Sequence, residues 1–247
     1  MKINARFWFI PIIVLSLFVF QQIASRFGSI ASGLFSYDRI DPYNIFMWIS
    51  VHHIVQGIIA LVAVGILIKV KNLDFGFRLG NVRVGLEHTL DFTIIVLIYV
   101  VVFYIITFAF GNFSAPNFPL NITNVAGTLG FQLLLSGPVE EILFRALPIT
   151  LLIYSFKASK PVKIYKVATT SETIIAAVLF TLAHVRWEIN PFSIDFSVHQ
   201  LVICLFCGIL YGIAYQKSNS VLYPMAMHSI WNVVIVGTRY ILAVLLA

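Results

Sequence analysis

Two adjacent glutamates and an arginine lie inside a long apolar segment, in the stretch GPVEEILFR at residues 137–145. A charge at bilayer depth costs about 3 kcal/mol or more, so such residues are candidates for function. Glu141 and Arg145 are four residues apart on a helix and can form an ion pair, whereas Glu140 is turned about 100° away from Glu141. The spacing therefore predicts one neutralised carboxylate and one available for chemistry. The alternative is a buried pair that only fixes helix packing.

Two later apolar segments add polar groups that could serve the same reaction. His184 ends the stretch FTLAH at 180–184, and His228 and Asn232 share one helix face in HSIWN at 228–232. Peptide hydrolysis needs an activated water, donors for the oxyanion and a proton for the leaving amine. We expect Glu140 to act as general base, His184 to hold the same water, and His228 and Asn232 to stabilise the oxyanion. No serine or cysteine has an evident base beside it, which disfavours a covalent mechanism.

A metal site could use the same side chains. Glu140, His184 and His228 make a set of two histidines and one glutamate, with water as the fourth ligand of zinc. The sequence lacks the HExxH pattern, so no pair of ligands is built on one helix. The sequence therefore leaves zinc open.

The composition defines the class of protein that carries these residues. Of the 247 residues, 60% are hydrophobic and 11% are charged, against about 25% charged in soluble domains. Apolar runs of this length and number predict an all-α, polytopic bundle of transmembrane helices in one domain over 1–247. The net charge of +6 gives no reason to expect nucleic acid, because the basic residues are concentrated in particular loops. Cys204 and Cys207 lie in an apolar helix and are expected to be packing residues.

Hydropathy places helices at about 7–25, 44–70, 88–110, 124–156, 172–186, 198–216 and 221–246. The last segment forms one helix or two, so the count is seven or eight, and the motifs lie in a core at about 124–246. We expect a kink at Gly137-Pro138, because proline removes a backbone hydrogen bond. His52, His53 and His199 are interpreted as packing or interfacial residues.

Basic residues predict the orientation. They gather near the N-terminus, in the loops 71–87 and 157–171, and at Lys217, whereas the other loops hold three arginines. This asymmetry predicts a cell-membrane protein with a cytoplasmic N-terminus. In this arrangement His184 falls near the outer end of the segment 172–186, away from Glu140. Convergence therefore requires that segment to start later, tilt or sit deeper.

The motifs EExxxR at 140–145, FxxxH at 180–184 and HxxxN at 228–232 resemble, in that order, the CAAX prenyl protease and bacteriocin-processing (Abi-type) family of intramembrane proteases. The resemblance covers about 137–232 and implies a bundle of about eight spans. It implies a glutamate-type peptidase in which Glu140 and His184 activate water, His228 and Asn232 stabilise the oxyanion, and Glu141 and Arg145 shape the site. It favours metal-independent chemistry without a cofactor. The implied partners are the lipid bilayer and a prenylated or hydrophobic C-terminal CAAX tail.

Two other functions could use the same polar residues. A proton-coupled transporter would use Glu140 and the histidines as a relay, and would need internal repeats or paired broken helices. No such repeat is visible in the sequence. A non-catalytic, immunity-type membrane protein would retain the fold alone, and a cleavage assay separates it from a protease.

Overall fold

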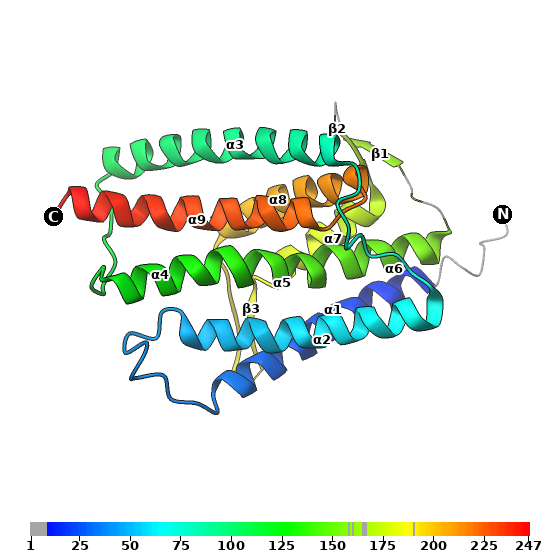
Figure 1. Ribbon diagram of the computed structural model, residues 1–247, viewed down its shortest axis with the longest axis horizontal. Coiled ribbons are helices and arrows are strands. Elements are labelled where there is room, and N and C mark those ends of the chain that lie inside the picture. The colour runs from blue at the N-terminus through cyan, green and yellow to red at the C-terminus, as the bar shows by residue number, and fades with distance from the viewer. Residues whose placement is uncertain (1–8, 158, 160, 165–166, 190) are drawn as a thin grey trace.

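The structure is a computed structural model that describes residues 9–157, 159, 161–164, 167–189 and 191–247. Its described part contains seven helical runs and two short hairpins. The runs are α1 (Phe9–Ser32), α2 (Met47–Lys71), α3 (Val82–Ala109), a continuous run over 122–156, α7 (Ser171–Leu182), α8 (Val198–Ser218) and α9 (Leu222–Leu245). In Figure 1 the run 122–156 lies between α9 and α2, so the motif-bearing helix is central to the bundle.

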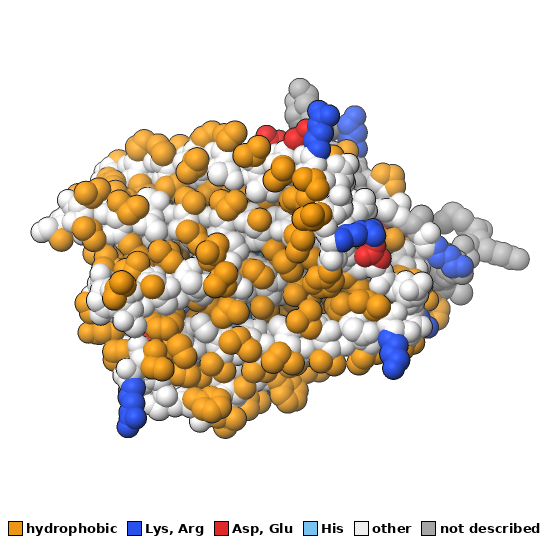
Figure 2. Space-filling model, in the orientation of Figure 1, with side chains coloured by type: hydrophobic (Ala, Val, Ile, Leu, Met, Phe, Trp, Pro, Cys, Tyr) orange, Lys and Arg blue, Asp and Glu red, His pale blue; other side chains and the backbone are white. Residues whose placement is uncertain are grey.

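The helices confirm an all-α, multi-pass membrane protein. Five of them, α1, α2, α3, α8 and α9, are long and apolar enough to cross a bilayer. The 28-residue helix α3 buries only one stripe, made of Gly85, Phe92, Val96, Val100 and Tyr104. Beyond its first turns, which carry the exposed residues Arg83, Glu87 and Asp91, its remaining surface is mostly apolar and exposed. Hydrophobic side chains are likewise spread over much of the face in Figure 2. Such a surface fits contact with lipid.

The last segment is a single helix rather than two. Pro224 lies in the first turn of α9, where its missing N–H would have no helical partner in any case. The described part of the chain therefore holds seven helical runs, the lower of the two expected counts.

The central run contains two widened turns. It is built from α4 (Ile122–Phe131), the π-helical turn η2 (Gln132–Ser136), α5 (Gly137–Glu141), a second π turn η3 (Ile142–Ala146) and α6 (Leu147–Phe156). Pro138 and Pro148 are each the second residue of the α segment that follows a π turn. Because proline cannot donate to the preceding turn, the helix widens before each one. Where the sequence predicted a kink at Gly137-Pro138, the structure has a π turn on either side of α5.

Helix α7 is shorter than the sequence predicted, and this brings His184 to the depth of the site. It ends at Leu182, and His184 lies in the following turn, where its backbone N–H donates to the Thr181 carbonyl. Twelve residues span about 18 Å, less than the roughly 30 Å of bilayer core. The chain then forms the hairpin of β3 (Arg186–Ile189) and β4 (Phe192–Asp195). His184, which the sequence placed away from Glu140, instead lines one cavity with His228.

A second hairpin precedes α7. The strands β1 (Pro161–Ile164) and β2 (Val167–Thr170) pair antiparallel, and the Thr170 side chain accepts a hydrogen bond from the Thr173 backbone N–H. Thr170 thereby caps the first turn of α7 and fixes where that helix begins. Neither hairpin was predicted from the sequence.

Glycines set the closest helix contacts around the central run. A Cβ on Gly137 of α5 would lie 2.7 Å from Ser229 Oγ of α9, and one on Gly57 of α2 would lie 3.0 Å from Val139 Cγ2 of α5. The missing side chains let α2 and α9 approach α5 from two directions. Polar residues next to these glycines are therefore brought within hydrogen-bonding range.

Candidate active site

The predicted pair of Glu141 and Arg145 forms, and it extends to a third residue. Glu141 Oε1 lies 2.9 Å from Arg145 Nη1 and 2.7 Å from His228 Nδ1, and the side chains of Glu141 and Arg145 are fully buried. The Arg145 guanidinium also lies 3.9 Å from the centroid of the Phe180 ring. An ionised carboxylate only accepts hydrogen bonds, so Nδ1 of His228 carries the hydrogen and donates it. Glu141 thus orients the His228 ring so that Nε2 faces away from Glu141 and lies on the side of Glu140.

Glu140 has a different environment, with one oxygen held and the other open. Its Oε1 accepts a hydrogen bond from Ser136 Oγ at 3.1 Å and lies 3.1 Å from His53 Nε2. Its Oε2 lies 3.9 Å from His228 Nε2, beyond hydrogen-bond distance. The described residues give Oε2 no hydrogen bond. The side chain is 15% exposed, so this oxygen is the one available to a reactant.

Asn232 joins the cluster through Ser136. Its Nδ2 donates to Ser136 Oγ at 3.0 Å, and Ser136 in turn donates to Glu140. One of the two amide hydrogens of Asn232 is used in this bond, and the second remains for another acceptor. His228 and Asn232 lie four residues apart on α9, as the sequence predicted, and both reach the central run.

His184 lies beside the Phe180 ring. Its Nδ1 lies 2.9 Å from the Phe180 carbonyl oxygen, an acceptor, so the ring donates there, and in the neutral ring the lone pair is on Nε2. The Phe180 ring is 4.7 Å from the His184 ring and 5.9 Å from the His228 ring. His184, His228 and Asn232 line one cavity of about 280 Å³. Glu140 is not part of that lining and meets it at His228.

Four residues of the site were not predicted from the sequence. His53 and Ser136 hold Glu140, while His199 and Tyr99 line the cavity and join through a 3.0 Å contact between His199 Nε2 and Tyr99 Oη. The sequence signal was present for His53, because an ionisable residue inside a membrane helix is itself a candidate. Its partner, Glu140, could not be predicted from the sequence, because it lies 87 residues away in the chain.

The residues considered for zinc do not form a ready metal centre. Within the described ranges, no group of three or more His, Cys, Asp and Glu side chains has an arrangement that could hold a metal ion. Nδ1 of His228 is bonded to Glu141 and Oε1 of Glu140 to Ser136, which leaves His228 Nε2 and Glu140 Oε2, 3.9 Å apart, as the unbonded atoms of these two residues.

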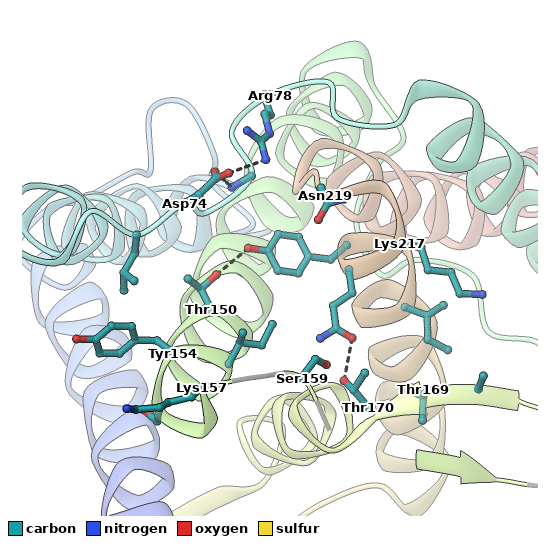
Figure 3. A pocket seen from close by; sticks show the side chains of 18 residues that line it. Asp74, Arg78, Thr150, Tyr154, Lys157, Ser159, Thr169, Thr170, Lys217 and Asn219 are labelled. Atoms are coloured by element: carbon teal, nitrogen blue, oxygen red, sulfur yellow. Dashed lines mark hydrogen bonds and ion pairs between the residues drawn. The ribbon is translucent and has the colours of Figure 1, made fainter. Parts of the chain in front are cut away.

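A larger cavity lies elsewhere among the described residues. It measures about 990 Å³ and is lined by residues of the α2–α3 loop, α6, β2 and the end of α8. Figure 3 shows Lys157 and Lys217 at its opposite edges, with Arg78 paired to Asp74 and Thr150 bonded to the Tyr215 hydroxyl. No residue of the cluster around Glu140 lines it, so size does not identify the reactive site in this protein.

Fold and site together define a polytopic helical membrane protein with a cluster of carboxylate, histidine and amide groups inside its bundle. Residues 121–234 match the family model of Rce1-like type II CAAX prenyl endopeptidases. That stretch contains all three sequence motifs, and the match confirms the resemblance to this family of CAAX-type proteases. Searches of curated proteins and of solved structures gave no match.

Proposed function

We propose that this protein is an intramembrane endopeptidase of the cell membrane that removes the last three residues of a prenylated CAAX-type tail. One observation carries the proposal: His184, His228 and Asn232, from two separate segments, line one small cavity, and Glu140 of a third segment has its Oε2 3.9 Å from His228 Nε2. Each supplies a group that amide hydrolysis requires.

The reaction begins with a water held between the open Oε2 of Glu140 and Nε2 of His184. Glu140 takes a proton as the water oxygen attacks the scissile carbonyl carbon, and a tetrahedral intermediate forms. The C–N bond then breaks, and the proton passes to the departing amine. The products are a shortened chain with a new carboxylate and a tripeptide with a free amine.

His228 and Asn232 stabilise the oxyanion of the intermediate. Asn232 offers its second amide hydrogen, and His228 donates from Nε2 when its ring carries both protons. The Glu141 carboxylate, 2.7 Å from Nδ1, offsets the positive charge of that ring. Glu141 therefore acts through His228 without touching the substrate.

An apolar groove supports a lipid-modified substrate. It has a volume of about 610 Å³, runs along the exposed side of α3, and is lined by residues such as Ile95, Ile98 and Val102. Tyr99, Phe103 and His199 line both this groove and the cavity that contains His184. A prenyl chain lying in the groove would leave the attached peptide next to the cavity.

The test uses purified protein in lipid vesicles and a farnesylated peptide that ends in a CAAX sequence. We expect release of the C-terminal tripeptide, identified by mass spectrometry, and slower cleavage of the same peptide without its lipid. The Glu140→Gln variant should fold normally and lose at least about 10²-fold in turnover. Normal turnover by that variant contradicts the mechanism, and no cleavage by the unaltered protein contradicts the function.

A chelator arm tests the metal-independent form of the proposal. Incubation with EDTA or 1,10-phenanthroline should leave turnover unchanged. Loss of activity that returns on adding zinc would overturn this part of the mechanism and leave the protease function standing.

A further inference from the structure

Helix α2 approaches the reactive glutamate through a glycine. Gly57 is packed on Val139, so closely that a Cβ at Gly57 would lie 3.0 Å from Val139 Cγ2. His53 lies one turn before Gly57 on the same face of α2, and Glu140 follows Val139. The packing therefore aims the buried His53 ring, 7% exposed, at the Glu140 carboxylate.

The hydrogen bonds of His53 require a proton between it and Glu140. Its Nδ1 lies 2.9 Å from the Ile49 carbonyl oxygen, which can only accept, so Nδ1 carries a hydrogen. A neutral ring then has only a lone pair at Nε2, which lies 3.1 Å from Glu140 Oε1. An ionised carboxylate also offers only lone pairs. The contact is a hydrogen bond only if the ring or the carboxyl group carries one further proton, and the two groups share it.

We propose that His53 is a positioning residue for Glu140, which holds Oε1 so that Oε2 is presented to the reaction. The inference rests on the proposed function and adds a residue from α2, outside the segment that carries the three motifs. Ser136 holds the same oxygen from within the central run at 3.1 Å. With Oε1 fixed from two directions, the carboxylate cannot rotate freely, and its second oxygen stays beside His228.

Two other histidines of the described chain lie near this contact. On its own helix, the His52 ring lies 5.3 Å from the His53 ring. From α9, His228 Nε2 lies 3.9 Å from the other oxygen of Glu140. The Phe131 ring packs edge-on against His53 at 5.0 Å and brings no charge. Glu140 is therefore the carboxylate that His53 contacts.

His52 provides a matched control on the same helix. It is buried to the same degree, 8% exposed against 7% for His53. Its ring faces α1, where Nδ1 lies 3.3 Å from Ser29 Oγ, and it stacks on Trp48 with centroids 5.5 Å apart. Replacing His52 therefore removes a buried histidine from α2 without removing a contact to the Glu140 carboxylate.

The kinetic test compares His53→Ala, His53→Gln and His52→Gln with the farnesylated peptide. A positioning residue that does not touch substrate should affect kcat and leave KM within about twofold. We expect His53→Ala to lower kcat at least about tenfold, less than the roughly 10²-fold loss expected on removing the base. His53→Gln should recover part of this loss, because its amide can donate to Oε1. His52→Gln should keep kcat near that of the unaltered protein.

Three results would overturn the role of His53. They are a kcat for His53→Ala equal to that of His52→Gln, an effect found only in KM, and no recovery in His53→Gln. Thermal unfolding of each variant shows whether a loss of kcat only reflects a damaged fold.

A measurement without substrate separates this inference from the proposed function. Unfolding temperatures of His53→Ala, Glu140→Gln and the double variant form a cycle, and groups in contact give non-additive shifts. Additive shifts overturn the contact even if the protein is a protease. Failure of the unaltered protein to cleave overturns the function, whatever the cycle shows.

Discussion

Glu140 and Glu141 are neighbours in the chain with opposite environments. Glu141 is fully buried and contacts Arg145 at 2.9 Å and His228 at 2.7 Å, whereas Glu140 is 15% exposed and keeps one oxygen without a hydrogen bond from the described residues. The turn of about 100° between successive helix residues produces this difference. One carboxylate neutralises a buried cation, and its neighbour faces the cavity side.

The two glutamates should therefore fail in different ways. Glu141→Gln leaves the Arg145 charge buried without its partner, which should lower the free energy of unfolding by about 3–5 kcal/mol. Glu140→Gln should lower turnover by about 10²-fold or more with little effect on unfolding. Purified variants measured for both cleavage and thermal unfolding check the contrast. Equal loss of stability in both variants would contradict the division of roles.

The residues on α9 should affect rate more than stability. His228→Ala and Asn232→Ala each remove one donor proposed for the oxyanion, and turnover should fall by about 10²- to 10³-fold. Ser229→Ala is the control, because its hydroxyl donates to the Leu133 carbonyl and does not contact Glu140. Steady-state cleavage assays give the comparison, and a decrease for Ser229→Ala as large as for Asn232→Ala would argue against specific oxyanion donors.

At the scale of elements, α2 and α9 both pack closely against α5 of the central run, each through a glycine. The Gly57 contact with Val139 brings α2 to the central run, and the contact of Gly137 with Ser229 brings α9 to it. The π turns on both sides of α5 set the direction in which Ser136 and Arg145 project. The site therefore depends on close helix packing, which a single methyl group can disturb.

A pair of glycine variants tests this dependence. In Gly137→Ala the new Cβ would lie 2.7 Å from Ser229 Oγ, so stability should fall by about 1–3 kcal/mol, as for an overpacked core. Gly130→Ala, on the same run, meets nothing within 4 Å and should be neutral or slightly stabilising. Thermal unfolding measures both, and equal effects of the two substitutions would show that the close approach is not required.

At the scale of the whole molecule, charge is concentrated at one end of an apolar bundle. Most Lys and Arg side chains visible in Figure 2 lie at the end where Figure 1 shows the β1–β2 hairpin and the junction of α2 with α3. Lys71, Lys157 and Lys217 lie at helix ends on this side. The distribution is the one from which a cytoplasmic N-terminus is predicted.

Cysteine labelling tests the orientation. Ser159 and Ser114 are both exposed and lie in connections that the orientation places on opposite sides of the membrane. With Cys204 and Cys207 replaced by serine, an impermeant thiol reagent applied to intact cells should label Ser114→Cys and not Ser159→Cys. The two native cysteines are buried, at 8% and 3% exposed, so their removal should leave most activity intact. Labelling at 159 alone would reverse the topology.

The sequence by itself determined the features that follow from helical periodicity and hydropathy. Hydropathy indicates the membrane helices. Helical periodicity indicates the pairing of Glu141 with Arg145 and the shared face of His228 and Asn232, because the residues of each pair are four positions apart. The family resemblance also followed from the sequence, because its motifs are local.

Only the tertiary structure decided which distant groups meet. The contact of His53 with Glu140 and that of His228 with Glu141 each join residues 87 positions apart, and that of Asn232 with Ser136 joins residues 96 apart. These contacts depend on how closely helices pack at glycines and on where α7 ends, at Leu182. Hydropathy indicates that a helix enters the bilayer, but it does not indicate which face of the helix packs against which neighbour. The site depends on that packing.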